Sequence, residues 1–235
     1  MTNTCKLADT CIEINYINDY FARFAAGYET DEPADFAITV TQADIDTERA
    51  RATEEGHTDK YLETLAIYRK ICDRLAERGI VLFHSSAVAV DGKAYLFTAP
   101  SGTGKSTHAR LWREVYGDHV TMINDDKPLL RITDAGATVY GTPWNGKHRL
   151  STNTSAPVCG ICILERGETN KIRRISASEA LPYLMAQTYR PSDPSGAVKA
   201  TELALKLAKI VPLWRLSCNM DIEAAQVSYN AMKGI

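Results

Sequence analysis

The residues whose chemistry is easiest to interpret form one short segment near the middle of the chain. It contains Ala99, Pro100, Ser101, Gly102, Thr103, Gly104, Lys105, Ser106 and Thr107. The segment follows the pattern G-x-x-x-x-G-K-[ST], with alanine in the place of the first glycine. In this pattern, backbone N–H groups and a helix start bind nucleotide phosphates, the lysine reaches the β- and γ-phosphates, and the serine hydroxyl contacts Mg²⁺. The segment therefore predicts a site for ATP and Mg²⁺.

The alanine at position 99 is a small departure from the pattern. Gly102 and Gly104 still supply a permissive backbone, and alanine is the smallest residue that carries a Cβ. The alternative is a glycine-rich turn between a strand and a helix. A turn of that kind has no need of a lysine followed by two hydroxyl side chains, so we favour the phosphate-binding interpretation.

A pair of acids follows the next apolar run. Residues 120–124 predict a short strand, and Asp125 and Asp126 come directly after it. Acids at the C-terminal end of a strand beside a phosphate loop are expected to control Mg²⁺ and the nucleophile in phosphoryl transfer. We expect Ser106 and Asp126 to hold Mg²⁺, and Asp125 or Asp126 to accept a proton from the phosphoryl acceptor.

His84 is placed by a predicted hairpin. Residues 80–90 and 93–98 read as strands around Asp91-Gly92, a pair typical of a two-residue type I′ turn. That register pairs His84 with Ala99 on one face, with Cβ atoms about 5 Å apart, at the base of the phosphate loop. A histidine there could steer the catalytic aspartate or help to neutralise the phosphoryl group. The alternative is a core histidine with its hydrogen bonds satisfied.

Two later loops carry basic residues. Residues 141–149 contain Pro, Gly and exposed polar types, and Lys147 and Arg149 could contact a substrate or the γ-phosphate. Arg190, in the loop 189–195, is a third candidate. Ordinary solvated charges in turns are the alternative for all three residues.

The composition argues against nucleic-acid and membrane partners. Lys and Arg total 27 against 29 Asp and Glu, a net charge of -2, so no charge pattern indicates nucleic acid or a membrane surface. The first residues contain no apolar leader, and no apolar run approaches a membrane span, so a cytoplasmic location is expected. The six cysteines are expected to be reduced, with Cys159 and Cys162 in a core strand and not in a zinc or redox site.

The remaining pattern predicts a small β-rich subdomain over 1–57 and a core over 58–235, with one continuous domain as the alternative. Antiparallel strands are expected near 12–17 and 36–40, and a solvated loop at 44–60. A helix over 59–78 should end at Gly79. Further strands are expected at 129–132, 137–140, 158–165 and 213–218, and helices at 107–116, 178–188, 196–210 and 221–232.

The stretch from His84 to Asp126 resembles the catalytic core of the HPr kinase/phosphorylase group, within the phosphoenolpyruvate-carboxykinase-like fold. The likeness lies in a strand histidine 21 positions before Lys105, the phosphate loop, and the Asp-Asp pair after an apolar strand. It implies an α/β (α+β) kinase core of mixed twisted sheets flanked by helices. It also implies that one aspartate accepts a hydroxyl proton, and that an acid and the loop serine hold Mg²⁺.

The resemblance implies a kinase that transfers the γ-phosphoryl group of ATP to an alcohol. The acceptor would be a serine-like hydroxyl in a peptide or protein, or in a small metabolite. A homo-oligomer is compatible with the sequence. The family's later glutamate-containing signature has no counterpart here, so the reverse phosphorolysis is not expected. The alternative function is a regulatory nucleotide-binding ATPase module without a phosphoryl acceptor.

Overall fold

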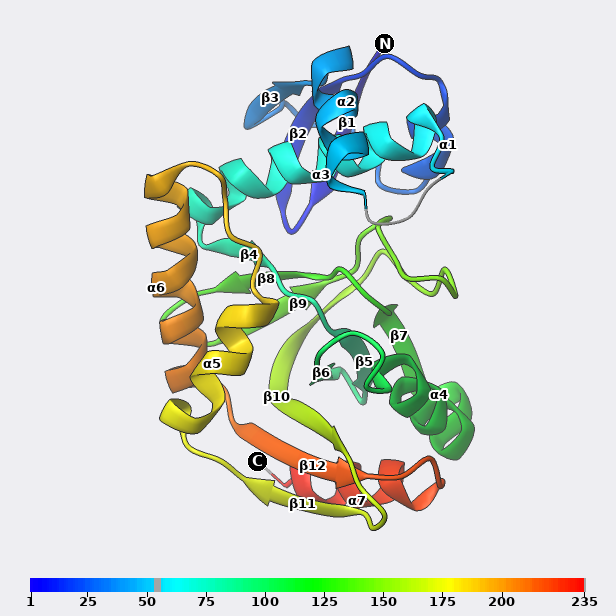
Figure 1. Ribbon diagram of the computed structural model, residues 1–235, viewed down its shortest axis with the longest axis vertical. Coiled ribbons are helices and arrows are strands. Elements are labelled where there is room, and N and C mark those ends of the chain that lie inside the picture. Colours follow the sequence, from blue (N-terminus) through cyan, green and yellow to red (C-terminus); the bar gives the residue numbers. More distant parts are fainter. Residues whose placement is uncertain (53–55, 235) are drawn as a thin grey trace.

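The computed structural model describes residues 1–52 and 56–234, and it is a mixed α/β protein of curled mixed sheets flanked by helices (Figure 1). A three-stranded sheet with its own helices forms the upper part in this view. A nine-stranded sheet forms the lower part. Among the described residues, no helix has both the length and the apolar character needed to cross a bilayer.

The N-terminal sheet differs from the expected antiparallel arrangement. Strands β1 (Thr2–Leu7) and β2 (Thr10–Asn15) form an antiparallel hairpin, but β3 (Phe36–Thr39) lies parallel to β2. The prediction is wrong for β3 because the connection after β2 contains helix α1 (Tyr20–Phe24) and returns the chain to the start of the sheet. Parallel pairing requires such a crossover.

The expected loop at 44–60 is also wrong in part, because helix α2 (Gln42–Arg51) occupies its first half. Thr41 and Asp44 form a capping box at its start. Glu48 of α2 is buried and accepts hydrogen bonds from the Arg69 guanidinium, which offsets the cost of burying its charge. The segment 53–55 of that predicted loop lies outside the described residues.

Helix α3 (Asp59–Leu75) and the 3-10 turn η1 (Ala76–Arg78) confirm the predicted helix, and Gly79 ends it in the left-handed conformation with φ +74°. The buried face of α3 shares one apolar core with the three N-terminal strands. Trp144, from the far loop 141–149, belongs to the same core. The N-terminal part of the chain is therefore packed directly against that loop.

The large sheet has the strand order β4-β8-β9-β10-β6-β5-β7, and β12 and β11 extend it from β10. Its strands are β4 (Ile80–Leu82), β5 (Ser86–Val90), β6 (Lys93–Thr98), β7 (Val120–Asn124), β8 (Leu129–Ile132), β9 (Ala137–Tyr140), β10 (Ser155–Arg166), β11 (Lys171–Arg174) and β12 (Leu213–Cys218). Strand β10 lies parallel to both β6 and β12 and carries Cys159 and the fully buried Cys162. Strand β11 is not among the strands expected from the sequence pattern.

The predicted hairpin is confirmed with its register, since β5 and β6 pair Val90 with Lys93 and Ser86 with Phe97. Asp91 and Gly92 both have positive φ, as a type I′ turn requires. The prediction of a single strand over 80–90 is wrong, because residues 83–85 interrupt it and divide it into β4 and β5. Before the break β4 pairs with β8, and after it β5 pairs with β6 and β7.

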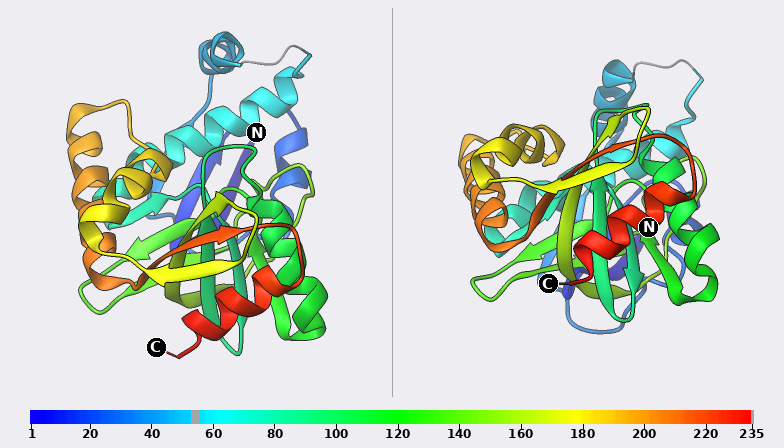
Figure 2. Two further views of the ribbon diagram at one scale, coloured as in Figure 1. Left: turned by 60° about the horizontal axis from the view of Figure 1, so that its bottom comes forward. Right: turned by 90° about the horizontal axis from the view of Figure 1, so that it is seen from below.

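Helices cover both faces of this sheet (Figure 2). Helices α4 (Lys105–Tyr116) and α7 (Glu223–Met232) pack into one core, and α5 (Ala177–Gln187) and α6 (Pro194–Ile210) pack into the other. Helix α4 starts two residues before its predicted first residue, directly after the glycines of the phosphate loop. The layers therefore place the loop 99–104 between β6 and α4.

Candidate functional site

An open cleft of about 1090 Å³ lies between the N-terminal part of the chain and the large sheet. Residues from the predicted phosphate loop, the Asp pair and the loop 141–149 line it together with His84. Side chains of α1 and α3 form the remaining wall. The fold therefore brings segments far apart in the sequence to one cavity.

The phosphate loop has the backbone that its glycines predict. Gly102 and Gly104 adopt φ +77° and +123°, conformations that other residues rarely take. Ala99 is buried and does not take a positive φ, so an alanine fits at that position. The loop leads directly into α4, whose first turn leaves N–H groups without intrahelical partners. At the tip of the loop, the Arg166 guanidinium donates a hydrogen bond to the Gly102 carbonyl (2.7 Å), a contact the sequence did not indicate.

The Lys105 side chain folds back onto its own loop. Its ammonium donates to the carbonyl oxygen of Ala99 at 2.8 Å, and the residue is only 8% exposed. Burial lowers the pKa of Lys105, and the negative charge of Asp126 opposes that shift. A second carbonyl, that of Pro100, lies 3.5 Å from the ammonium. Because these two carbonyls are weaker partners than a phosphate, the ammonium is free to exchange them for an anion that enters the cleft.

Asp125 is buried at the end of β7 and is only partly satisfied by hydrogen bonds. Its Oδ1 accepts from the Gly146 N–H at 2.5 Å, whereas its Oδ2 has no partner among the described residues. Burial raises the pKa of Asp125, the charge of Asp126 raises it further, and the Gly146 N–H partly offsets both effects. An orphaned buried carboxylate oxygen at the edge of a cleft is unusual in proteins and indicates a missing proton or ligand.

Asp126 is held as an anion by two neighbours. Its Oδ1 lies 2.8 Å from His84 Nε2, and the Lys127 ammonium donates to its Oδ2. Burial alone raises the pKa of Asp126, but the His84 hydrogen bond and the Lys127 charge outweigh burial and hold the pKa well below its usual range. The pKa values of the two adjacent acids are thus shifted in opposite directions, upward for Asp125 and downward for Asp126.

The structure places His84 at the site by a route that differs from the predicted one. The ladder between β5 and β6 ends at Ser86, and His84 lies in the break before it and is not in a ladder pair with Ala99. The Thr98 hydroxyl donates to the His84 carbonyl at 3.0 Å, which keeps the two strands close at that point. The break turns the imidazole toward Asp126.

Asn124 is the main residue that the sequence analysis did not identify. Its side chain is fully buried, and its Oδ1 accepts from the N–H groups of Asp126 (2.8 Å) and Lys127 (2.7 Å). Its amide nitrogen donates to the carbonyls of Thr142 and Trp144, both at 3.1 Å. One side chain therefore fixes the turn that carries the acids and joins it to the loop 141–149. An asparagine before two acids is the only signal in the sequence.

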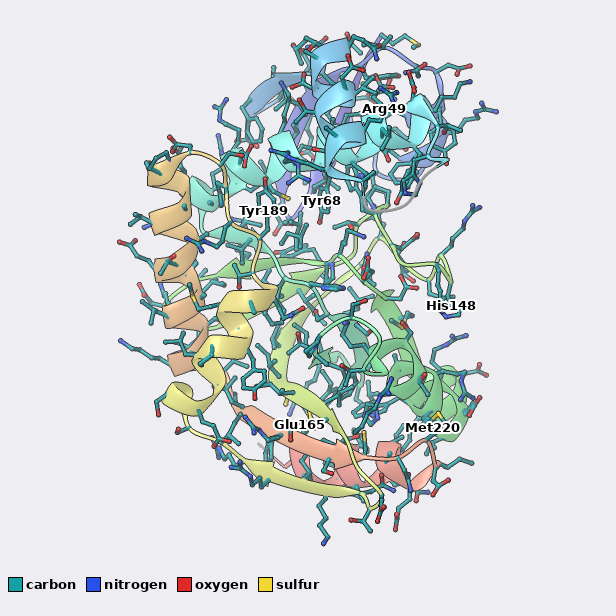
Figure 3. All side chains as sticks on the ribbon, viewed as in Figure 1. Arg49, Tyr68, His148, Glu165, Tyr189 and Met220 are labelled. Carbon is teal, nitrogen blue, oxygen red and sulfur yellow. The ribbon has the colours of Figure 1, made fainter. Side chains whose placement is uncertain are left out.

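The loop 141–149 is anchored from α3. Tyr68, labelled in Figure 3, stacks on Trp144 with ring centroids 4.1 Å apart and planes 2° from parallel. The Trp144 indole donates to the Thr64 carbonyl at 2.8 Å, and the Tyr68 hydroxyl donates to the Lys127 carbonyl at 2.7 Å. Helix α3 therefore supports both the loop and the turn beside Asp126.

Two glycines of that loop lie close to neighbouring atoms: Gly141 is required by a backbone contact, and Gly146 leaves little room beside Asp125. A Cβ at Gly141 would lie 1.9 Å from the Thr152 carbonyl oxygen, and one at Gly146 would lie 3.1 Å from Asp125 Oδ2.

The three basic residues proposed to contact a substrate or the γ-phosphate differ in their position relative to the cleft. Lys147 and Arg149 are exposed and line the cleft, whereas Arg190 is exposed and does not line it. Arg149 has φ +53°, an uncommon conformation for arginine.

Oxygen groups of this site suit Mg²⁺. The hydroxyl of Ser106, at the start of α4, lines the same cleft as the ionised Asp126 and the orphaned oxygen of Asp125. Within residues 1–52 and 56–234 no cluster of three or more His, Cys, Asp and Glu side chains has metal-binding geometry. A site with one or two carboxylates fits Mg²⁺, which usually keeps several waters and shares the phosphates of a bound nucleotide.

Comparison with known proteins gives one family. The family model described as "ScmC: SynChlorMet cassette protein ScmC" matches residues 54–223. No curated protein matches the chain. A solved structure titled "Structure of the Hpr(Ser) kinase/phosphatase from Coxiella burnetii" is similar over 65% of this chain and 99% of its own, with 11% sequence identity and a TM-score of 0.37. The family match includes the phosphate loop, the Asp pair and the loop 141–149.

Proposed function

We propose that this chain, which belongs to the family described as SynChlorMet cassette protein ScmC, is an ATP- and Mg²⁺-dependent kinase that transfers the γ-phosphoryl group to an alcohol. The observation that carries the proposal is the convergence of three sets of groups on one cleft. These are the loop with Lys105 and Ser106, the buried Asp125, and Asp126 with its partner His84. Phosphoryl transfer depends on positioning and on neutralised charge, which these groups supply.

The phosphate loop binds the donor in this proposal. The N–H groups of residues 102–106 and the ammonium of Lys105 bind the β- and γ-phosphates, and Lys105 leaves the Ala99 carbonyl to do so. Ser106 and Asp126 hold Mg²⁺, which when bound neutralises part of the phosphate charge. His84 and Lys127 keep Asp126 ionised and oriented for that role.

The opposite pKa shifts of Asp125 and Asp126 indicate which of the two acts as the general base. A carboxylate with a depressed pKa is a weak base and a good ligand for a hard cation, which describes Asp126. A carboxylate whose pKa is raised by burial is closer to the operating pH and accepts a proton more readily, which describes Asp125. We therefore assign proton removal to Asp125.

These groups account for the bonds and the proton in the transfer step. The acceptor oxygen forms a bond to the γ-phosphorus as the bond from that phosphorus to the β–γ bridging oxygen breaks. The hydroxyl proton passes to Asp125 Oδ2, and ADP leaves with the electron pair of the broken bond. The acceptor is a peptide or protein serine, or a small hydroxylated metabolite.

Phosphoryl transfer to a library of hydroxyl compounds, measured beside phosphate release without an acceptor, tests the proposal. We expect ATP consumption to rise when a competent alcohol is present, and a phosphate ester to form in equal amount. Phosphate release that no alcohol changes would favour the alternative, a regulatory ATPase module. A protein that neither binds nor hydrolyses ATP would refute both functions.

A further inference from the structure

One wall of the cleft comes from outside the groups that the proposed kinase reaction uses. Helices α1 and α3 contribute Tyr20, Arg23, Phe24, Tyr61 and Leu65, which we name the N-terminal wall. The α1 residues are spaced i, i+3 and i+4, and the α3 residues i and i+4, so each set occupies one helix face. The wall thus presents aromatic and aliphatic groups, and one cation, to the cleft.

The position of the N-terminal wall is fixed by a buried carboxylate. Glu63 of α3 is fully buried, and it accepts hydrogen bonds from the N–H groups of Ile17 (2.5 Å) and Asn18 (3.0 Å), just before α1. Burial of a carboxylate is costly unless it is hydrogen-bonded, so these contacts hold the start of α1 on α3. The short helix is therefore a built part of the cleft.

Aromatic contacts tie α1 to the catalytic side of the cleft as well. Phe21 is fully buried, and its ring lies 6.2 Å from that of Trp144. Phe24 packs edge-on against Trp144 with centroids 5.6 Å apart. Since Asn124 holds the Trp144 carbonyl, the wall is connected through two packed residues to the turn that carries Asp125.

Arg23 adds a positive charge to the wall that no carboxylate of residues 1–52 and 56–234 pairs with. The nearby ion pair joins Lys60 to Asp19 at 3.4 Å and leaves Arg23 without a carboxylate partner among the described residues. Lys147 and Arg149 add positive charge at the same cleft. A guanidinium in the same cleft as aromatic rings matches a ligand that carries a carboxylate next to an apolar group.

The location of the wall indicates which substrate it meets. The phosphate loop and α4 lie below the loop 141–149 in Figure 1, and α1 lies above it. In phosphoryl transfer the attacking oxygen approaches the γ-phosphorus from the side opposite the leaving ADP. A nucleotide seated on α4 therefore leaves the side of the N-terminal wall for the acceptor.

We propose that the N-terminal wall is the acceptor subsite, and that it selects a hydroxyl compound carrying a carboxylate beside an aromatic or aliphatic group. Arg23 binds the carboxylate, and Tyr20, Phe24, Tyr61 and Leu65 cover the apolar group. This inference rests on the proposed kinase function, because only that function requires an acceptor. Both a peptide with a C-terminal carboxylate and a small hydroxy acid have the required chemistry.

Equilibrium binding to the full chain saturated with Mg²⁺ and ADP tests the subsite without turnover. The probes are acetyl-Phe-Ser as free acid and as amide, and 3-phenyllactate and its amide. We expect the wild type to bind at least one free acid about tenfold more tightly than its amide, the size expected for a hydrogen bond to a charged group. The peptide and phenyllactate arms distinguish the two sources of the carboxylate.

Arg23→Gln should abolish the preference for the free acid and leave ADP affinity unchanged, whereas Arg23→Lys should keep part of it. Arg174→Gln is the matched control, because Arg174 is exposed on β11, far from α1 (Figure 1). Equal binding of acid and amide by the wild type, no binding of any probe by the wild type, or loss of ADP affinity in Arg23→Gln would each overturn the subsite. A retained acid preference without phosphoryl transfer would refute the kinase function alone.

Discussion

The replacement Asn124→Ala tests whether one buried amide holds the turn that carries Asp125 and Asp126. The wild-type side chain, which is itself fully buried, satisfies the N–H groups of the half-buried Asp126 and Lys127 and the carbonyl of the buried Thr142. The Trp144 carbonyl loses the amide donor, but the Thr142 hydroxyl lies 3.1 Å away and can donate to it, because the Lys127 carbonyl has a second donor in Tyr68. Alanine therefore leaves three backbone groups without their partners.

The expected cost follows from those three groups. An unsatisfied buried donor or acceptor costs about 1–3 kcal/mol, and water that enters the vacated space offsets part of the sum. We expect the free energy of unfolding to fall by about 3–5 kcal/mol, a large fraction of the roughly 5–15 kcal/mol of a typical domain. Phosphoryl transfer should fall as well, because the turn that carries Asp125 and Asp126 loses its support.

Urea unfolding followed by far-ultraviolet circular dichroism measures the change. Thr142→Val is the matched control. It removes one hydroxyl proton, which can serve either the Lys127 carbonyl (2.9 Å) or the Trp144 carbonyl (3.1 Å). Both carbonyls keep another donor, Tyr68 at 2.7 Å for Lys127 and Asn124 at 3.1 Å for Trp144. The control should cost about 1 kcal/mol. If Asn124→Ala cost no more than Thr142→Val, Asn124 would not be the residue that organises the turn.

Four further outcomes are expected. Lys105→Ala should keep the fold but lose turnover, because its ammonium contacts only loop carbonyls before phosphates bind; unchanged phosphoryl transfer would exclude the phosphate-loop assignment. Asp125→Asn should lose chiefly the chemical step and Asp126→Asn chiefly Mg²⁺ affinity, measured by single-turnover transfer and metal titration; wild-type rates and metal dependence in both would leave the pair without a role. His84→Ala should slow the chemical step roughly 10²-fold with little change in nucleotide affinity or Tm, because it removes the partner of Asp126; a wild-type rate would make His84 a core residue. Because the folded-state pKa of Asp126 is depressed, its stabilising effect is present above about pH 4, the unfolded value, and is lost as the pH falls below it. The free energy of unfolding of the wild type should therefore fall more steeply with decreasing pH than that of Asp126→Asn. The same pH dependence in both proteins would contradict this.

Local chemistry made several features predictable from sequence. Asp91-Gly92 specifies a type I′ turn because both residues tolerate positive φ, and that turn fixes the β5–β6 register. Gly79 ends its helix for the same conformational reason. The phosphate loop is a contiguous segment, so residue order alone defines its glycines, its lysine and the start of α4. In each case the interacting residues are neighbours in the chain.

The contacts between segments that are distant in the sequence could be identified only from the tertiary structure. Asn124 can be recognised only when β7 delivers it to the carbonyls of Thr142 and Trp144, and the hydrogen bond from His84 to Asp126 depends on the break between β4 and β5. The parallel pairing of β3 with β2 follows from the crossover through α1, which also brings Arg23 to the cleft. The sequence alone identified the residues that we propose to bind phosphate and Mg²⁺. The packing of the two sheets and α3 around Trp144 decided that Asp126 is paired, that Asp125 is left buried, and that the N-terminal wall faces both acids. These outcomes depend on contacts between residues that are far apart in the chain.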